Sequence, residues 1–515
     1  MFHVRLTKTK SKSTAVQVVQ YKNRKTVIFK HIGSTKDKEE LFHLKTVAVN
    51  WIKQHNPQLE LFPSNIQINQ SKQSTTQEHP LSKVIVLNQA KLISTHSIFI
   101  YEILSKLTKS LGFSRLLDGF PERQFLLDLV ITRLIHPASK IESIKFLEEE
   151  FDIKYERNNL YRSLVQWTPL KDEVEDIIVT FAKKNLDFSF NIIFYDVTTL
   201  YFESFKSDEE LKQCGFSKDN KFNQPQIVIG LVVNNQGFPV SYEIFAGNKF
   251  EGDTFIPVLD RLQKKYYIKT LTVVADAAMI SKKNVDELVD KNLNYIVGAR
   301  LGSLAHKTIN TISKSLNKQD LATTEILTER GILICAFSQK RYQKDKQDTE
   351  KQINRAKKTI SDPKKNVKRL KFVTTANTKL TINKKLINKS KRLWGIKGYY
   401  TNLQGINHKD IIYQYHQLWN VEKSFRITKS DLQARPIYHR NTQTIQSHIL
   451  ICFMALSIAK YVEIKTGLSL NRVINILKTV KDAKIKNQLM NEIITMRSDP
   501  STDVDNLLEK LDLSY

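Results

Sequence analysis

The 515-residue chain is poor in cysteine. Its three cysteines, Cys214, Cys335 and Cys452, lie far apart and form no CxxC pair. This spacing excludes a disulfide framework and a cysteine-based zinc module, so we expect free thiols. The N-terminus MFHVRLTKTKSKS lacks the apolar core of a signal peptide. The longest mostly apolar run, 449–459, is too short to span a bilayer. We therefore expect a cytosolic protein with no membrane partner.

Acidic residues are also scarce relative to basic ones. The 52 Asp and Glu residues face 80 Lys and Arg residues, which leaves a net charge of +28. A field of this sign suits a polyanion, although scattered lysines could equally form an ordinary solvated surface. Residues 340–397 hold 20 basic and 4 acidic residues, interleaved with apolar ones. Such clustering favours a folded basic face and makes nucleic acid the leading class of partner.

The first part of the chain predicts several small domains. Apolar and polar residues alternate on both sides of a turn, so residues 1–55 should form a small strand and helix unit. Residues 56–94 are polar and punctuated by proline, which predicts a linker. Residues 95–188 have helical periodicity throughout and predict an all-α domain, for which DNA binding is one interpretation.

Two helices and a turn are expected within that all-α domain. The second helix would present Arg157, Tyr161 and Arg162, in the manner of a DNA recognition helix. A plain face of a helical bundle fits the same pattern at least as well, because amphipathic helix pairs recur in every α domain.

The periodicity changes to that of an α/β fold after residue 189. Three strand-like runs and then alternating helices and strands extend over 189–301, which predicts a ribonuclease H-like mixed sheet. A basic, β-rich insertion is expected at 302–400. Helical spacing resumes at 401–465, which we assign to the second part of the same α/β domain, and 466–515 should form C-terminal helices.

Two aspartates interrupt apolar strands of the expected sheet. Asp196 lies within NIIFYDVTTLYF, and a charge in a strand needs a cation, hydrogen bonds or a solvent-filled cleft. A strand-end Asp bonded to nearby backbone amides is the alternative. Asp276 follows the strand TLTVVA, at the edge where α/β sheets collect ligands. It could instead cap the next helix, but Ser281 is the better N-cap.

A glutamate on a later helix completes a set of three acids. At about 100° per residue, one arc of this helix carries an acid amid aromatic and basic side chains, with Val421 and Phe425 packing to one side. Such a face suits a metal ligand flanked by phosphate contacts. An exposed Glu–Arg pair four residues apart would give the same pattern. The residues of the arc are Tyr415, Leu418, Trp419, Glu422, Arg426 and Lys429.

Asp196, Asp276 and Glu422 together could bind divalent metal. Hard cations prefer oxygen ligands, and Mg²⁺ keeps coordination sites for water and phosphate oxygens. Two Mg²⁺ ions, with Mn²⁺ able to substitute, can activate the attacking oxygen and stabilise the leaving oxygen at phosphorus. The three acids therefore predict phosphodiester chemistry.

The chain resembles insertion-sequence transposases of the DDE type, whose catalytic domain is split by a β-rich insertion. Their signature is Tyr, two residues, Arg, three residues, Glu, six residues, Lys, and here Tyr415, Leu418, Glu422 and Lys429 stand at these positions. Three of the four match. Leu418 replaces the arginine, and Arg426 could substitute for it. YDVTTLYFE, GNKFEGDT and VVADAAMIS support the resemblance.

The resemblance implies an activity and a set of partners. Such enzymes bind terminal inverted repeats, nick DNA to expose a 3′-hydroxyl and join that end to target DNA, as homo-oligomers on double-stranded DNA in the bacterial cytosol. It implies DNA contacts for Tyr415, Arg426 and Lys429. Trp394 is the candidate for stacking on a flipped base, and a core tryptophan of the insertion is the alternative.

Two other functions fit the same residues. A ribonuclease H-like nuclease would use the same three acids without strand transfer. A sequence-specific DNA-binding protein with an inactive catalytic domain is the second alternative. The long insertion and the Tyr-to-Lys helix favour a transposase over the nuclease.

Overall fold

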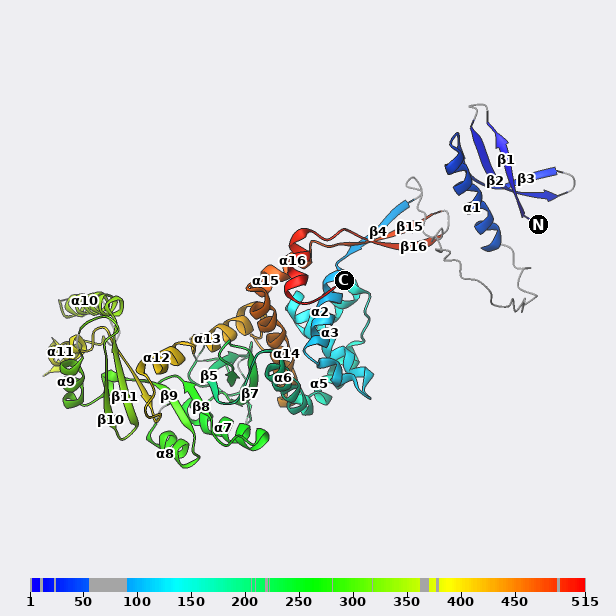
Figure 1. Cartoon of the computed structure of the whole chain (residues 1–515). Helices are drawn as coiled ribbons and strands as arrows, with labels where there is room; N and C mark the ends of the chain where they lie inside the picture. Colours follow the sequence, from blue (N-terminus) through cyan, green and yellow to red (C-terminus); the bar gives the residue numbers. More distant parts are fainter. Residues whose placement is uncertain are drawn as a thin grey trace. The chain divides into compact units, whose positions relative to one another are not determined.

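A computed structural model gives the structure of the chain (Figure 1). It describes residues 2–9, 13–22, 25–54, 90–204, 206–208, 210–217, 221, 223–279, 281–316, 318–361, 370–376, 379–488 and 491–514. The chain divides into two compact units. Unit 1 comprises Met1–Phe99 and Lys478–Ser501, and unit 2 comprises Ile100–Leu477 and Thr502–Tyr515.

Unit 1 begins with a small sheet covered by one helix. Strands β1 (Phe2–Lys8), β2 (Thr14–Lys22) and β3 (Lys25–Thr35) pair antiparallel in sequence order. Helix α1 (Lys38–Gln54) packs on them, because alternate strand residues such as Val16 and Val18 meet its apolar stripe at Leu44 and Ala48. The small N-terminal β unit predicted from the sequence is thereby confirmed.

A second sheet of unit 1 joins segments from opposite ends of the chain. Its order is β16-β15-β4, all antiparallel, and its strands are β4 (Ala90–His96), β15 (Asp482–Asn487) and β16 (Glu492–Arg497). The predicted linker 56–94 therefore ends in a strand, while residues 55–89 lie outside the described residues. The expected C-terminal helices are interrupted by the β15–β16 hairpin, and β15 is also paired with β4 from the other end of the chain.

Unit 2 starts with a helical layer. Helices α2 (Ile98–Ser110), α3 (Gln124–Ile135), α4 (Lys140–Phe151), α5 (Arg157–Gln166) and α6 (Lys171–Asn185) follow one another. The long helix α14 (Thr442–Thr466) contacts α3, α5, α6 and β7. By length and composition α14 could cross a membrane, but 94% of its most apolar window is buried inside the protein. Within the described residues it is a core helix.

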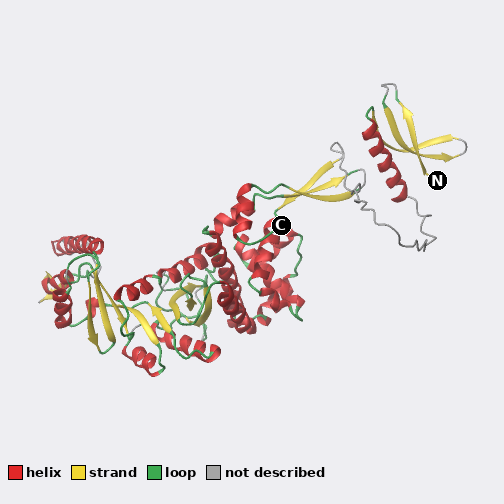
Figure 2. Ribbon diagram, viewed as in Figure 1, coloured by secondary structure: helices red, strands yellow, loops and turns green. Residues whose placement is uncertain are grey.

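The central sheet of unit 2 has the strand order β10-β11-β14-β9-β8-β5-β6-β7. Strands β5, β6 and β7 form an antiparallel meander, and β8 and β9 continue parallel to β5. This is the predicted ribonuclease H-like mixed sheet. Figure 2 shows helices on both sides of it. The strands are β5 (Ile192–Tyr201), β6 (Gln226–Val233), β7 (Pro239–Ala246), β8 (Thr272–Ala275) and β9 (Asn294–Ala299).

Two pairs of helices cover the two faces of this sheet. Helices α7 (Gly252–Tyr266) and α8 (Lys282–Asp290) lie on one face, where Tyr195 donates a hydrogen bond to Thr254 at 2.7 Å. Helices α12 (His408–His416) and α13 (Trp419–Arg426) contact the strands from the other face. Side chains alternate along a strand, so Asp196 faces α13 whereas Tyr195 faces α7.

The insertion is mixed rather than purely β-rich. Its strands β10, β11 and β14 extend the main sheet beyond β9, with β14 antiparallel to β9. The basic stretch contains a long helix, α10, and the insertion includes two further helices. The elements are α9 (His306–Ser315), β10 (Thr323–Thr328), β11 (Gly331–Phe337), α10 (Gln339–Ser361), β12 (Val373–Ala376), β13 (Lys379–Ile382), α11 (Lys384–Arg392) and β14 (Ile396–Thr401). Helices α15 (Leu470–Leu477) and α16 (Thr502–Lys510) complete unit 2.

Candidate active site

The sheet register brings the two aspartates together. In the parallel pair β5–β8, Ile192 lies opposite Thr272 and Tyr195 opposite Ala275. Asp196 and Asp276 are the next residues of the two segments. Neighbouring strands lie about 4.8 Å apart, so the two acids follow adjacent strands at the same level. A single strand pairing thus unites residues that lie 80 positions apart in the sequence.

Glu422 opens into the same cavity from helix α13. The cavity has a volume of about 450 Å³ and is open to solvent on the α13 face of the sheet. Asp276 and Glu422 are exposed there, and Asp196 is half-buried. The three acids share this cavity with the basic residues Arg426, Lys429 and Arg435. All three acids and two of the basic residues that the sequence predicted therefore line one pocket.

The contacts of each acid can be compared with the non-catalytic role that the sequence also allowed for it. Asp196 Oδ1 accepts a hydrogen bond from the amide of Val197 at 2.8 Å, so one of its carboxylate oxygens is bonded to the backbone. The hydroxyl of Ser281 caps α8 by accepting from the amide of Asn284 at 3.1 Å, which leaves Asp276 free of that task. Among the described residues, which include both Glu422 and Arg426, no ion pair joins these two.

The three carboxylates are suitable ligands for a hard divalent cation, but they are not arranged around a single ion position in this structure. Carboxylate oxygens are the ligands that Mg²⁺ and Mn²⁺ take in proteins. Within the described part of the chain, no three acidic, histidine or cysteine side chains are already gathered at ligand distance. Like charges repel, so three carboxylates in an open cavity stay apart until a cation balances them. DDE transposases as a class use divalent metal ions.

Tyr415 is hydrogen-bonded to one of the aspartates. Its side chain is only 8% exposed, and its hydroxyl donates a hydrogen bond to Asp276 Oδ1 at 3.3 Å. Burial, and then the negative charge of Asp276, raise the pKa of Tyr415, so the phenol stays a donor at neutral pH. The sequence predicts that this residue contacts DNA, and in the structure its hydroxyl donates to the carboxylate of Asp276.

The predicted single helix around Glu422 is broken in two. Between α12 and α13, Asn420 and Val421 donate to carbonyls three residues back, which tightens the chain there. Trp419 is consequently 50% exposed and does not line the cavity. After α13 a π-helical segment, Ile427–Asp431, carries Lys429 into the cavity wall. The packing stripe of Val421 and Phe425 is buried as expected.

Leu418 occupies the place of the signature arginine. It is 6% exposed and gives the cavity an apolar wall just before α13. Arg426, one turn beyond Glu422, lines the same cavity. A guanidinium is therefore present at the site, although it comes from another turn of the chain.

Trp394 lies in a different cavity, of about 400 Å³, between α10, α11 and the edge of β14. Its indole Nε1 donates to Thr349 Oγ1 at 3.0 Å, and its ring meets Tyr342 edge-on at 5.8 Å. The ring is half-buried and lines the cavity wall. Both the core interpretation and the stacking interpretation remain consistent with this position.

Sequence reasoning missed two basic residues near the acids. Lys397 lies with its Nζ 4.6 Å from the ring centre of Tyr415. Burial and Arg341 lower the pKa of Lys397, whereas Asp276 and Glu422 oppose that shift. Arg435 lines the cavity with its guanidinium 5.6 Å from the ring centre of Tyr201. The sequence signal for Lys397 was its position within the strand-like run GIKGYY. No sequence signal indicated Arg435.

Comparisons with known proteins show the family of the chain. The family model described as "Transposase DDE domain" matches residues 188–458. The comparison with curated proteins gives no match. Among solved structures, a piggyBac transposase synaptic complex with hairpin DNA is 12% identical, with a TM-score of 0.35 and 69% of each chain covered.

A Mos1 transposase paired-end complex with the left transposon end is also similar. It is 13% identical with a TM-score of 0.16, and 49% of this chain and 66% of that chain are covered. These structural likenesses are too weak to support an argument, whereas the family model spans more than half of the chain and contains all three acids. The chain belongs to the DDE transposase family.

Proposed function

We propose that Asp196, Asp276 and Glu422 are the metal-binding carboxylates of this transposase. They would hold two Mg²⁺ ions, which Mn²⁺ can replace. The observation that carries this proposal is the parallel register of β5 and β8, which sets Asp196 beside Asp276 in the cavity that Glu422 lines. The chemistry that such ions supply is activation of the attacking oxygen and stabilisation of the leaving oxygen at phosphorus.

The other residues of the cavity would bind and orient DNA. Arg426, Lys429 and Arg435 place positive charge beside the acids, where the phosphates flanking a scissile bond would lie. Tyr415 would keep Asp276 in position through its hydrogen bond. These residues support cleavage at terminal inverted repeats and joining to target DNA in one site.

The partners and location follow from the same activity. We infer that the enzyme acts as a homo-oligomer on double-stranded DNA, with paired element ends, in the cytosol and on the nucleoid. The strongly basic insertion supports a role in holding DNA. Trp394, with its ring on a cavity wall next to Lys397, is the candidate to stack on a base displaced near the cut.

The test is an end-processing assay with the full chain. Linear DNA carrying the sequences that flank the gene is incubated with Mg²⁺, and cleaved ends and joined products are separated. Asp196→Asn should lose both products by at least 10³-fold, about the scale for a group essential to the chemistry, and should still bind DNA. Asp286→Asn, an exposed acid on α8, is the matched control and should behave as the wild type.

Metal removal separates the alternatives. Chelation with EDTA should abolish both products and leave DNA binding intact, and Mn²⁺ should restore activity. The thermal unfolding midpoint should rise with Mn²⁺ in the wild type and not in Glu422→Gln. Cleavage without joining would favour the nuclease, and binding without cleavage would favour the inactive protein.

A further inference from the structure

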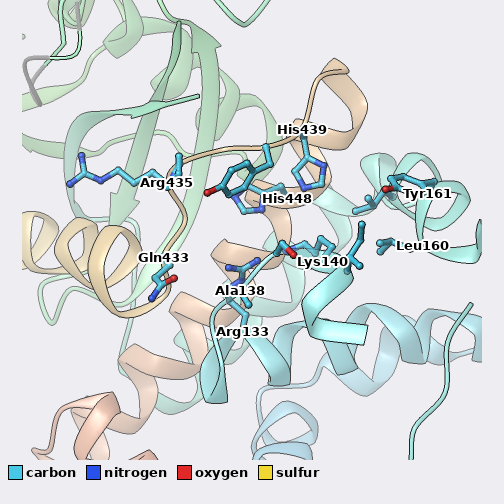
Figure 3. A pocket seen from close by; sticks show the side chains of 14 residues that line it. Arg133, Ala138, Lys140, Leu160, Tyr161, Gln433, Arg435, His439 and His448 are labelled. Atoms are coloured by element: carbon cyan, nitrogen blue, oxygen red, sulfur yellow. The ribbon is translucent and has the colours of Figure 1, made fainter. Parts of the chain in front are cut away.

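A second cavity in unit 2 lies among α3, α4, α5 and the chain after the π-helical segment. Its volume is about 430 Å³, and it is distinct from the cavity of the three acids. Figure 3 shows four side chains from three helices and this segment gathered around one space. These are Arg133 of α3, Lys140 of α4, His448 of α14 and His439 of the segment between the π-helical turn and α14.

Three of these groups carry buried nitrogen atoms without a hydrogen-bond partner among the described residues. They are Arg133 Nε, Lys140 Nζ and His448 Nδ1. The side chains are 3%, 5% and 5% exposed. Other nitrogen atoms of two of these side chains are hydrogen-bonded. Arg133 Nη1 donates to the carbonyl of Leu432 at 3.4 Å, and His448 Nε2 donates to the carbonyl of Ala434 at 3.0 Å. Arg133 Nε and Lys140 Nζ are donors, whereas His448 Nδ1 carries a hydrogen only when the ring is protonated, because Nε2 already donates to Ala434. Burying such polar atoms unpaired is unfavourable.

The wall of this cavity, as far as the structure describes it, contains neither aspartate nor glutamate. Elsewhere in the same unit a buried cation has an acid: Lys460, 2% exposed, bonds Glu463 at 2.6 Å. At Lys140, burial and then the charge of Arg133 lower the pKa of the amine well below its usual range. Burial, Lys140 and Arg133 likewise lower the pKa of His439 to about 4. An anion would balance the charge of this cluster.

We propose that this cavity binds a phosphate group of the DNA backbone. A tetrahedral phosphate accepts several hydrogen bonds at once, and arginine, lysine and histidine are suitable donors. A water molecule occupies about 30 Å³ of liquid, so the cavity holds a phosphate together with several waters. The assignment to DNA, rather than to a free anion, rests on the proposed function.

The position of the cavity favours DNA as the source. Arg435 lines both this cavity and that of the three acids. Figure 3 shows its side chain directed away from the other four basic groups. A strand lying across the acids and contacting Arg435 would therefore lie next to this cavity. Tyr161 of α5, 47% exposed, lines this cavity and belongs to the helix for which a DNA recognition helix and a plain bundle face were the two interpretations of the sequence.

The experiment compares Lys140→Met with Lys145→Met in the full chain. Lys145 lies on the same helix, with its side chain 63% exposed, and is the matched control. DNA binding is measured by fluorescence anisotropy across salt concentrations. Lys140→Met should weaken binding about tenfold and lower the slope of log affinity against log salt by about 0.9, the value for one phosphate contact. Lys145→Met should leave both unchanged.

A scan with single methylphosphonates identifies the phosphate itself. One uncharged linkage should weaken binding to the wild type and have no additional effect on Lys140→Met. If Lys140→Met bound DNA with unchanged affinity, salt slope and methylphosphonate pattern, the inference would be overturned even where cleavage persisted. If the wild type did not cleave DNA while its DNA binding still depended on Lys140, the proposed chemistry would be overturned and the assignment of the cavity would stand.

Two further measurements keep the result interpretable. Thermal unfolding tests whether Lys140→Met is folded. If it is not, His439→Gln takes its place, because this variant removes a half-buried ring from the same wall and should weaken binding by about threefold. Inorganic phosphate is compared with chloride at equal ionic strength. Stabilisation by phosphate without any dependence of DNA binding on Lys140 or His439 would mean a free-anion site and overturn the assignment to DNA.

Discussion

Tyr415 shows how one hydroxyl can link a signature residue to one of the three acids of the cavity. The phenol is buried, and its bond to Asp276 crosses from α12 to the end of β8. Gly298 of β9 makes this approach possible, since a Cβ at that position would lie 2.5 Å from the Tyr415 hydroxyl. The first residue of the signature therefore acts on the orientation of a carboxylate.

Removing this hydroxyl should slow the chemistry without unfolding the protein. Tyr415→Phe keeps the ring and its packing, and we expect the rate of end cleavage to fall about tenfold, the effect of one hydrogen bond of about 1.4 kcal/mol. Single-turnover rates at saturating Mg²⁺ measure it. Tyr413→Phe, exposed on the same helix, is the control. Equal rates for the two variants would remove Tyr415 from the site.

Glu175 is a buried acid that serves the fold. Its carboxylate has no exposed surface and meets Lys171 at 3.1 Å and Lys265 at 3.4 Å, with Arg261 also bonded to it. Ser241 of β7 donates to the same group at 2.9 Å. The network ties α6 to α7 and to the edge of the sheet that carries Asp196.

Loss of the Glu175 charge should destabilise unit 2. Glu175→Gln removes a fully buried charge from three half-buried cations that keep other acids as partners, so it should cost about 2 kcal/mol, the scale of hydrogen bonds to a charged group. Urea unfolding at pH 7 measures the change. Glu173→Gln, whose side chain is 43% exposed and pairs with Arg123 at 3.4 Å, should cost less than about 1 kcal/mol. Similar losses in the two variants would contradict a structural role for the buried charge.

The same network predicts an acid-dependent stability. Burial alone would raise the pKa of Glu175, but Lys171 and Arg261 outweigh it and the pKa is lowered. A lowered folded-state pKa contributes stability above the unfolded value of about 4.3, and that stability is lost as the pH falls through the folded value. The urea midpoint of the wild type should therefore drop below about pH 4.3 more steeply than that of Glu175→Gln.

At the scale of elements, the π-helical segment Ile427–Asp431 decides where the signature lysine lies. A π segment contains one more residue per turn than an α-helix would, so it rotates the residues after it. Lys429 reaches the cavity of the three acids through this segment, whereas Trp419, expected on the same arc, is turned to solvent. Strict helical periodicity placed Leu418, Arg426 and Lys429 on the side of Glu422, where they line the cavity, and was wrong for Trp419.

Lys429 should contribute affinity more than rate. Lys429→Met removes one positive charge from the cavity wall, and we expect DNA binding to weaken about fivefold, with the salt slope reduced by about 0.9. Anisotropy titrations across salt concentrations measure both. Lys409→Met, on the exposed side of α12, is the control. A large loss of cleavage rate at saturating DNA would show instead that Lys429 acts in the chemistry.

Local patterns predicted the part of the fold that positions the aspartates. Strands β5 to β9 were predictable, because each is a short apolar run bounded by polar residues, and Asp196 and Asp276 stand out within or after such runs. The pairing of β14 with β9 and of β15 with β4 was not predictable, since those partners lie far apart in sequence. Lys397 and Arg435 were missed for the same reason: their place at the acids depends on tertiary packing.

At the scale of the whole molecule, the excess of positive charge is unevenly placed. Helix α10 has several lysines on its exposed surface and is joined to β14 by a bond from the Gly395 amide to Asp345 at 3.0 Å. Through β14 the helix adjoins Lys397 and the acids. Helices α7 and α8, on the opposite face of the sheet, also carry exposed lysines. DNA bound at the acids should therefore be sensitive to charge on α10 and less sensitive to charge on α7 and α8.

Two triple variants with equal loss of charge distinguish a local contact from a general field. Lys344, Lys351 and Lys358, seven residues apart and all exposed on α10, are changed to glutamine together. Removing one lysine–phosphate interaction lowers the salt slope by about 0.9, so we expect a reduction between about 1 and 3. The control changes Lys264, Lys282 and Lys283 on α7 and α8 in the same way. Because long-range fields are screened within about 10 Å at 0.1 M salt, the control should leave the slope nearly unchanged. Equal slopes for the two variants would mean that DNA responds to the net charge of the molecule and makes no particular contact with α10.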